Sequence, residues 1–243
     1  MEKLSKVAKF LQESDWIEGV HHELDEYEKA LNKTYPLDPE DEPDYVSDHA
    51  YAFFYCYQHR EEPPDIYGAL QLHKRLMVGT NLSATSVGAF RTIQVRVGPH
   101  IPPNPAVIHY HMDNWQNAVN PKESDPWKNH AMFETVHPFV DGNGRTGRLL
   151  WAWDQLRRGN CVGSFLEYYF KDIQKFLTPD ALEYFNVQVQ KGDHPEALDR
   201  LRKNIYYAAL NREGIKPLLE LKHVEKLFPD VDKFIRRYEL GAS

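Results

Sequence analysis

The stretch His137-Pro138-Phe139-Val140-Asp141-Gly142-Asn143-Gly144-Arg145-Thr146-Gly147-Arg148 is the most informative part of this 243-residue chain. Its Gly-Asn-Gly turn exposes backbone N–H groups, and glycine permits positive φ and close approach of a ligand. We predict a helix directly after the turn, with its positive N-terminal end at the same place. Arg145 and Arg148 are neighbours on one face of that helix, and both can bind phosphate oxygens. The stretch therefore predicts a phosphate-binding site.

Two other residues of the stretch add chemistry to this prediction. Asp141 is a hard oxygen ligand of the kind that Mg²⁺ prefers when it bridges phosphates. His137 has an ordinary pKa suited to general-base catalysis. Each residue alone has a commoner explanation, since His-Pro and Asp-Gly occur in turns and paired arginines cover solvated helix faces. The combination favours phosphate chemistry.

Outside this stretch, capping residues and the spacing of apolar residues predict a series of helices along the chain. Between the first two, residues 36–46 are rich in proline and acid and predict a surface linker. Ile93, Val95 and Val97 alternate with polar residues before Gly98-Pro99, which predicts one short hairpin. The expected architecture is all-α with a small β-hairpin flap. Helices are predicted from Ser14 to before Pro36, from about 47 to before Pro63, over 65–79, 105–119, 126–136 and 146–158, and from 178, from 194 and within 216–240.

Composition narrows the function classes. The net charge of −7 and pI of about 5.9 argue against a protein that binds nucleic acid through its phosphates. No run of about 18 apolar residues predicts a membrane span, and the N-terminus lacks the apolar run of a signal peptide. Cys56 and Cys161 are interpreted as small buried residues in a reducing compartment. We expect a cytoplasmic protein without nucleic-acid or membrane partners.

Residues 137–148 resemble the signature of the Fic family, H-P-F-x-(D/E)-G-N-G-R-x-x-R, at every fixed position. The resemblance extends over roughly residues 50–210 and implies a Fic-type helical bundle. It divides the chain into an N-terminal inhibitory helix and linker (1–46), a core (47–212) and a C-terminal helical extension (213–243). Within the core it implies a flap at 91–103 and a catalytic loop at 137–148.

The resemblance also implies an activity, the transfer of AMP from ATP to a hydroxyl side chain of a target protein. His137 would deprotonate the serine, threonine or tyrosine hydroxyl, which attacks the α-phosphorus of ATP. Asp141 would hold the Mg²⁺ or Mn²⁺ ion that bridges the phosphates. The anion cradle would comprise Gly142, Asn143 and Gly144, and the β- and γ-phosphates would be bound by Arg145 and Arg148. Most of the rate would come from positioning and charge stabilisation.

Two regions for recognition of the acceptor and of adenine are also predicted. An extended edge formed by Thr92, Ile93, Gln94 and Val95 can bind a target segment by strand addition, although a packing hairpin explains the same pattern equally well. The resemblance places the adenine pocket near residues 182–193, with Tyr184 and Gln190 as candidates.

A second motif precedes the core. Ser14-Asp15-Trp16-Ile17-Glu18-Gly19 resembles the inhibitory motif (S/T)-x-x-x-E-(G/N) of the family, whose glutamate pairs with the second motif arginine, here Arg148. Periodicity alone places Glu18 off the apolar stripe and makes it a solvated residue. The two interpretations agree if that side of the helix faces the active-site cleft.

Other readings of the same site stay open. It could take another nucleotide or phosphodiester donor, or remove AMP with Glu18 positioning a water. A non-catalytic interaction module is the alternative from another class, although such a module has no need of the intact constellation. Self-modification and a homodimer are left open as well.

Overall fold

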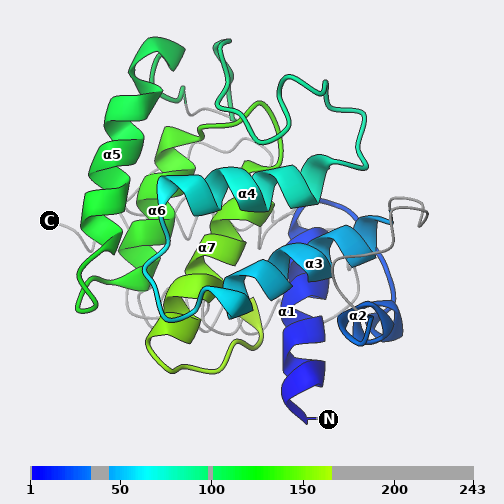
Figure 1. The fold of residues 1–243 in the computed structure, drawn as a ribbon. Coiled ribbons are helices and arrows are strands. Elements are labelled where there is room, and N and C mark those ends of the chain that lie inside the picture. Colours follow the sequence, from blue (N-terminus) through cyan, green and yellow to red (C-terminus); the bar gives the residue numbers. More distant parts are fainter. Residues whose placement is uncertain (1, 34–43, 98–100, 166–243) are drawn as a thin grey trace, which may run out of the picture. The chain divides into compact units, whose positions relative to one another are not determined.

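A computed structural model describes residues 2–33, 44–97 and 101–165, all of which lie in one compact unit, residues 1–165. The other unit, residues 166–243, lies outside the described residues, and so do the expected C-terminal helices and the adenine-pocket candidates Tyr184 and Gln190. The described part is helical, which confirms the all-α prediction (Figure 1). Its elements are α1 (Glu2–Ile17), α2 (Leu24–Leu31), α3 (Tyr45–Gln58), α4 (Ile66–Met77), the 3₁₀ turn η1 (Pro105–Val107), α5 (Ile108–Val119), α6 (Pro126–Val136) and α7 (Asn143–Arg157).

Helix α7 lies in the middle of this unit and packs against α1, α3, α4 and α6 (Figure 1). Residues 145–155 are buried without interruption, so the helix has no solvent face and needs no amphipathic pattern. An aromatic cluster surrounds its middle turn, where Trp151 contacts Phe10 of α1 and Phe165 at ring-centroid distances of 6.2 and 5.2 Å. Burial of such large rings dominates the hydrophobic stabilisation of the unit.

Several helices begin where capping residues predict. The Asp125 side chain accepts hydrogen bonds from the first backbone N–H groups of α6, and Pro126 occupies the first helical position. Asp65 caps α4 in the same way by accepting from Gly68 N. The predicted helix 126–136 is confirmed at both ends, and local chemistry sets its start.

The N-terminal segment differs from its prediction. The predicted single helix from Ser14 to before Pro36 is wrong, because α1 ends at Ile17 and α2 begins at Leu24. Gly19 has φ +80°, and the N–H groups of Gly19 and Val20 bond to the carbonyls of Trp16 and Asp15. This is a Schellman motif, which ends a helix and leaves Glu18 as its C-cap residue.

Three smaller expectations also change. Helix α7 begins at Asn143, so the Gly-Asn-Gly turn already enters its first turn. Residues 92–96 are irregular and Val97 forms an isolated bridge, so the hairpin is not confirmed in the described residues. Cys56 is buried as expected, whereas Cys161 is exposed.

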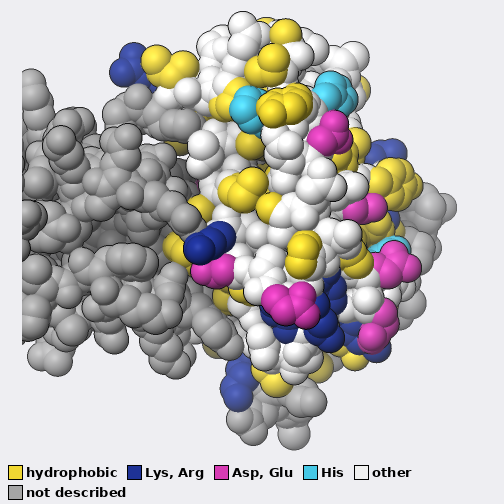
Figure 2. Space-filling model, turned by 90° about the vertical axis from the view of Figure 1, so that its left-hand side faces the viewer, with side chains coloured by type: hydrophobic (Ala, Val, Ile, Leu, Met, Phe, Trp, Pro, Cys, Tyr) yellow, Lys and Arg dark blue, Asp and Glu magenta, His cyan; other side chains and the backbone are white. Residues whose placement is uncertain are grey.

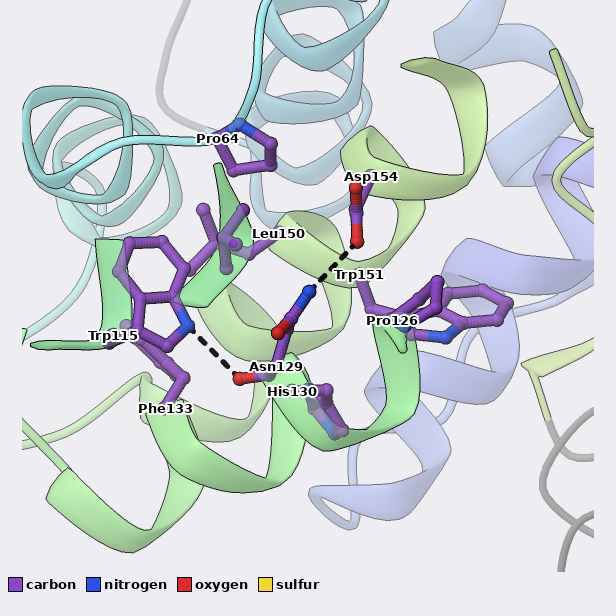
Figure 3. Close-up of a pocket in the computed structure, with 10 residues that line it drawn as sticks. Pro64, Trp115, Pro126, Asn129, His130, Phe133, Leu150, Trp151 and Asp154 are labelled. Carbon is purple, nitrogen blue, oxygen red and sulfur yellow. Dashed lines mark hydrogen bonds between the residues drawn. The ribbon is translucent and has the colours of Figure 1, made fainter. Parts of the chain in front are cut away.

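Far from the motif loop, a polar network joins α5, α6 and α7 (Figure 3). The Trp115 indole donates to the Asn129 carbonyl at 3.0 Å, and the Asn129 amide donates to Asp154 at 3.3 Å. The adjoining cavity measures about 10 Å³, which is too small for a substrate. Asn129 precedes the end of α6 by about two turns, so this network sets the orientation of α6 on α7 at the end remote from the loop.

Figure 2 shows the side of the molecule on which α5 lies, with apolar side chains dispersed among polar and charged ones over its described part. Exposed apolar residues such as Val107 and Tyr110 are of this kind, and single exposed apolar residues are normal. Within the described residues, none of the helices combines the length and the apolar character needed to cross a bilayer.

Candidate active site

The motif loop connects the C-terminus of α6 to the N-terminus of α7, two helices that pack against each other. The chain turns by left-handed backbone at both ends: His137 is the C-cap of α6 with φ 48°, and Gly142 is the N-cap of α7 with φ 72°. Left-handed backbone is uncommon for a residue other than glycine, so tertiary contacts must hold His137 in place. A Cβ on residue 142 would lie 2.7 Å from Met77 Sδ, which adds a packing reason for glycine there.

The Asn143 side chain closes the loop from inside. Its Oδ1 accepts from Phe139 N at 2.8 Å, and its Nδ2 donates to Phe139 O at 2.9 Å. Both ends of the amide are therefore used within the loop. Asn143 is buried and shapes the loop through this contact, so a ligand at the anion cradle would meet the main chain near it rather than this side chain.

Helix α4 also contacts the motif loop, through His73. This contact was not predicted from the sequence. His73 Nδ1 accepts from Gly88 N at 2.9 Å, so its Nε2 carries the proton and donates to Asp141 O at 3.0 Å. The imidazole stacks on Phe139 with 3.8 Å between centroids, and burial lowers its pKa to about 4. A histidine in a predicted amphipathic helix carries no signal for a partner 68 residues away.

The start of α7 is suited to an anion, and the Glu18 carboxylate lies there. Glu18 Oε1 accepts from Arg148 Nη2 at 2.7 Å, and a Cβ placed on Gly144 would collide with the same oxygen. Backbone N–H groups at a helix N-terminus and a guanidinium together attract negative charge. Arg148 is fully buried, whereas the Glu18 side chain is 26% exposed, so the anion site opens to solvent through Glu18.

Arg148 also binds the end of α1. Its Nε donates to Ser14 Oγ at 2.9 Å and its Nη2 to the Ser14 carbonyl at 2.8 Å. This carbonyl belongs to the last turn of α1, where helix carbonyls lack partners within the helix. A cation at a helix C-terminus is favourable, so the motif arginine caps the helix that presents Glu18.

Arg145 precedes Arg148 by three residues and has other partners. It donates to the Tyr45 hydroxyl, and its guanidinium carbon is 4.9 Å from the Tyr45 ring centroid. It also contacts Met77 Sδ at 3.6 Å. The two motif arginines are therefore both buried but held by different elements, Arg145 by α3 and α4 and Arg148 by α1.

Asp141 is exposed at the end of the loop and accepts from Gly142 N at 2.7 Å. Among residues 2–33, 44–97 and 101–165 no group of three or more His, Cys, Asp or Glu could hold a metal ion. Mg²⁺ commonly takes one or two carboxylates together with phosphate oxygens and water. Asp141 fits such a partial donor set, in which a nucleotide would supply the remaining oxygens.

The structure thus brings together the motif residues 137–148 with Ser14 and Glu18. Thr92, Ile93 and Gln94 are exposed and Val95 is half-buried, in a segment joined to the motif loop through the buried Arg91. Arg91 is the first residue of the expected flap 91–103. Nothing in the sequence indicated that its side chain reaches the motif loop.

A model of the Fic/DOC family matches residues 63–153, which include the motif loop and all of α4 to α6. Over 97 residues the chain is 36% identical to the protein adenylyltransferase Fic of Drosophila virilis and 37% identical to that of Drosophila melanogaster. These alignments cover 37% of this chain in both cases. The chain spans about a fifth of the length of these curated relatives, 20% and 19%.

Two solved structures share the fold. A Fic family protein from Desulfovibrio desulfuricans G20 aligns with TM-score 0.51 and 20% identity, over 91% of this chain and 66% of its own. A Fic domain containing signaling protein from Bacteroides thetaiotaomicron VPI-5482 aligns with TM-score 0.54 and 17% identity, over 88% and 91%. The fold and the site therefore define a class of helical domain in which a loop leads into a helix whose N-terminus is suited to bind an anion. Residues 63–153 match the Fic/DOC family, so the chain contains a Fic domain.

Proposed function

We propose that this chain is a protein adenylyltransferase that transfers AMP from ATP to a serine, threonine or tyrosine hydroxyl and is autoinhibited by Glu18. The Drosophila relatives bear the name of this activity. The observation that carries the proposal is the Glu18 carboxylate at the start of α7, 2.7 Å from Arg148. If the Glu18 carboxylate moves away, a phosphate group can take its place at the start of α7. Glu18 would then restrain the binding of a phosphate ligand.

In the proposed reaction, His137 takes the proton of the acceptor hydroxyl, and the acceptor oxygen attacks the α-phosphorus. The new oxygen–phosphorus bond forms as the bond to the β-phosphate oxygen breaks, and pyrophosphate leaves with the electron pair. Arg145, Arg148 and the backbone at Gly142 and Gly144 bind the departing phosphates. Asp141 holds Mg²⁺ or Mn²⁺, which neutralises phosphate charge when bound. Positioning and electrostatics supply most of the acceleration.

Autoinhibition follows from competition for one guanidinium. Arg148 is engaged by Glu18 and twice by Ser14, so the γ-phosphate lacks its cation while α1 keeps this position. The ion pair is partly buried, and its carboxylate is held at a helix C-cap by the Gly19 turn. Binding of ATP in a productive pose therefore requires Glu18 to leave.

The decisive experiment compares the full-length wild type with Glu18→Gly and with Glu18→Gly/His137→Ala, each incubated with α-labelled ATP, GTP, UTP or CTP. Glu18→Gly is expected to label itself or an added target about tenfold or more above wild type, an effect of roughly 1.4 kcal/mol. Labelling should depend on ATP and be lost in the double variant. Glu61→Gly, an exposed loop glutamate, is the control and should label as wild type does.

Each alternative has its own result. If another nucleotide labels the protein and ATP does not, that nucleotide is the donor. Faster release of AMP from a labelled protein by the wild type than by Glu18→Gly would indicate removal rather than transfer. Absence of labelling with all four nucleotides in Glu18→Gly would contradict the transferase proposal and favour an interaction module.

The division of the chain belongs to this proposal. Residues 1–46 would form the inhibitory region, 47–212 the catalytic core and 213–243 an extension. The segment 91–103 would bind the acceptor, with Thr92 to Val95 as its edge, and Tyr184 and Gln190 would contact adenine.

A further inference from the structure

Arg91 is a buried cation whose partners are main-chain carbonyl groups. Its side chain is 2% exposed, and burial lowers the pKa of its guanidinium. The guanidinium donates to His137 O at 2.8 Å, Pro103 O at 2.7 Å, Ile93 O at 3.0 Å and Val136 O at 3.4 Å. Burying a charge against neutral carbonyls costs free energy. An ion pair does not account for this burial, because the side-chain partners given above are carbonyl groups.

These carbonyls belong to two separate parts of the chain. Ile93 and Pro103 lie near the two ends of the segment 91–103, and Arg91 ties those ends together. Val136 and His137 form the junction of α6 with the motif loop, where His137 adopts left-handed backbone. The main chain adds to the same link, since Arg91 N donates to Pro138 O at 2.8 Å. One residue therefore connects both parts.

We propose that Arg91 is a positioning residue that holds His137 and the segment 92–97 in one fixed arrangement. The proposal rests on the proposed function, in which His137 is the general base and this segment binds the acceptor. Fixing both from a single planar group sets the distance between the acceptor hydroxyl and the imidazole. A misplacement of about 1 Å is enough to cost about 100-fold in rate.

The chemistry of arginine suits this role and that of lysine does not. Guanidinium presents five N–H donors in a rigid plane, whereas an ammonium is a compact group with three. Lysine keeps the charge at position 91 but cannot reach carbonyls in both segments. Arg91→Lys therefore separates the positioning role from the charge.

Arg157 provides a matched control. Its guanidinium also donates to main-chain carbonyls, those of Asn120, Val119 and Pro121 at 3.1, 3.1 and 3.4 Å, and it pairs with Asp154 at 3.1 Å. These contacts join the C-termini of α5 and α7, away from the motif loop. Arg157→Lys should therefore lower stability without moving His137.

The test places Arg91→Lys and Arg157→Lys separately in the full-length Glu18→Gly protein. Below both unfolding midpoints, Arg91→Lys is expected to lower kcat about 100-fold and to raise the KM for the acceptor. Its Kd for ATP should stay within about threefold, because the phosphate groups of α7 are unchanged. Arg157→Lys should keep kcat within about threefold. Equal kcat values for the two variants would overturn the proposal.

A measurement independent of activity accompanies the kinetics. Amide hydrogen exchange in Arg91→Lys should become faster than in the Glu18→Gly parent in both 92–97 and 136–140 but not in 108–119. Unchanged exchange in either of the first two segments would overturn the link. If Arg91→Lys does not fold, the neutral Arg91→Gln replaces it, and failure of both to fold would assign Arg91 to folding instead. An inactive Glu18→Gly parent would count against the proposed function alone, since the exchange result does not depend on it.

Discussion

At the scale of single residues, Glu134 carries an unusual buried carboxyl group. It lies on α6 against Gly147 of α7, and neither of its oxygens has a hydrogen-bond partner within the described residues. Burial raises its pKa to about 8, the nearby Glu18 charge acts in the same direction, and Arg148 opposes both. The folded protein therefore keeps a proton at neutral pH that the unfolded chain releases.

This proton makes stability depend on pH. Between the ordinary pKa of glutamate and about 8, the folded state binds more protons than the unfolded state, so the free energy of unfolding falls as the pH rises. Glu134→Gln removes this dependence, and its stability relative to wild type should grow with pH by up to about 1.4 kcal/mol per unit. Urea unfolding at pH 5, 6, 7 and 8 measures the difference.

The comparison needs only one control. Glu123→Gln alters an exposed carboxyl group and should show no such trend. The buried histidines His73 and His130, whose pKa values fall to about 4 and about 3, destabilise the fold in acid, but equally in both proteins. Parallel stability curves for wild type and Glu134→Gln would contradict the assignment.

At the scale of elements, α1 leads to Ser14 and Glu18, the residues proposed to be inhibitory. Its Asp15 is fully buried and accepts from the Tyr27 hydroxyl of α2 at 2.6 Å, while His49 of α3 lies 2.9 Å from the same oxygen. The contacts with His49 and Tyr27 lower the pKa of Asp15 against the effect of burial. Three elements thus converge one residue after Ser14, where α1 meets Arg148.

Loosening this anchor should weaken autoinhibition. Tyr27→Phe removes the hydroxyl, leaves Asp15 with His49, and is expected to cost about 1 kcal/mol of stability. ATP-dependent labelling should rise a few-fold in the wild-type background, because Glu18 leaves Arg148 more easily, and should not change in Glu18→Gly. Tyr110→Phe, on the exposed face of α5, is the control. An equal rise in both backgrounds would show that the effect does not act through Glu18.

At the scale of the whole molecule, ligand binding and stability are linked. A ligand that binds only the folded state stabilises it by about 2.7 kcal/mol at 100 times its Kd. Under the proposed function, ATP would also have to displace Glu18 from Arg148 in the wild type, which would raise the apparent Kd.

We therefore expect ATP with Mg²⁺ to raise the thermal midpoint of Glu18→Gly more than that of wild type at equal concentration. His137→Ala in the Glu18→Gly background should keep the larger shift, because the proposed role of His137 is to act on the acceptor rather than on the phosphates. Thermal unfolding monitored by tryptophan fluorescence measures all three proteins. Equal shifts in wild type and Glu18→Gly would mean that Glu18 does not compete with the nucleotide.

Much of this architecture follows from interactions between residues close in sequence, and these can be predicted from the sequence. The start of α6 matches its prediction because Asp125 and Pro126 act within the first turn of the helix. The motif 137–148 likewise indicates an anion site, since its glycines and the helix start are neighbours in sequence. The error at the N-terminus was also local, because Gly19 marks a helix end by a turn that spans only residues 15–20.

Contacts between residues distant in the chain could not be derived in this way. Periodicity alone made Glu18 a solvated residue, and only the family resemblance predicted its pair with Arg148, 130 positions away, which the structure shows. Arg91 and His73 reach the motif loop across 46 and 68 positions, and neither contact was predicted. Helix ends and turns arise from backbone conformations and hydrogen bonds within a few residues. Which side chain occupies the anion site, and which groups hold His137, depends on how buried helices pack, and that packing exists only in the folded chain.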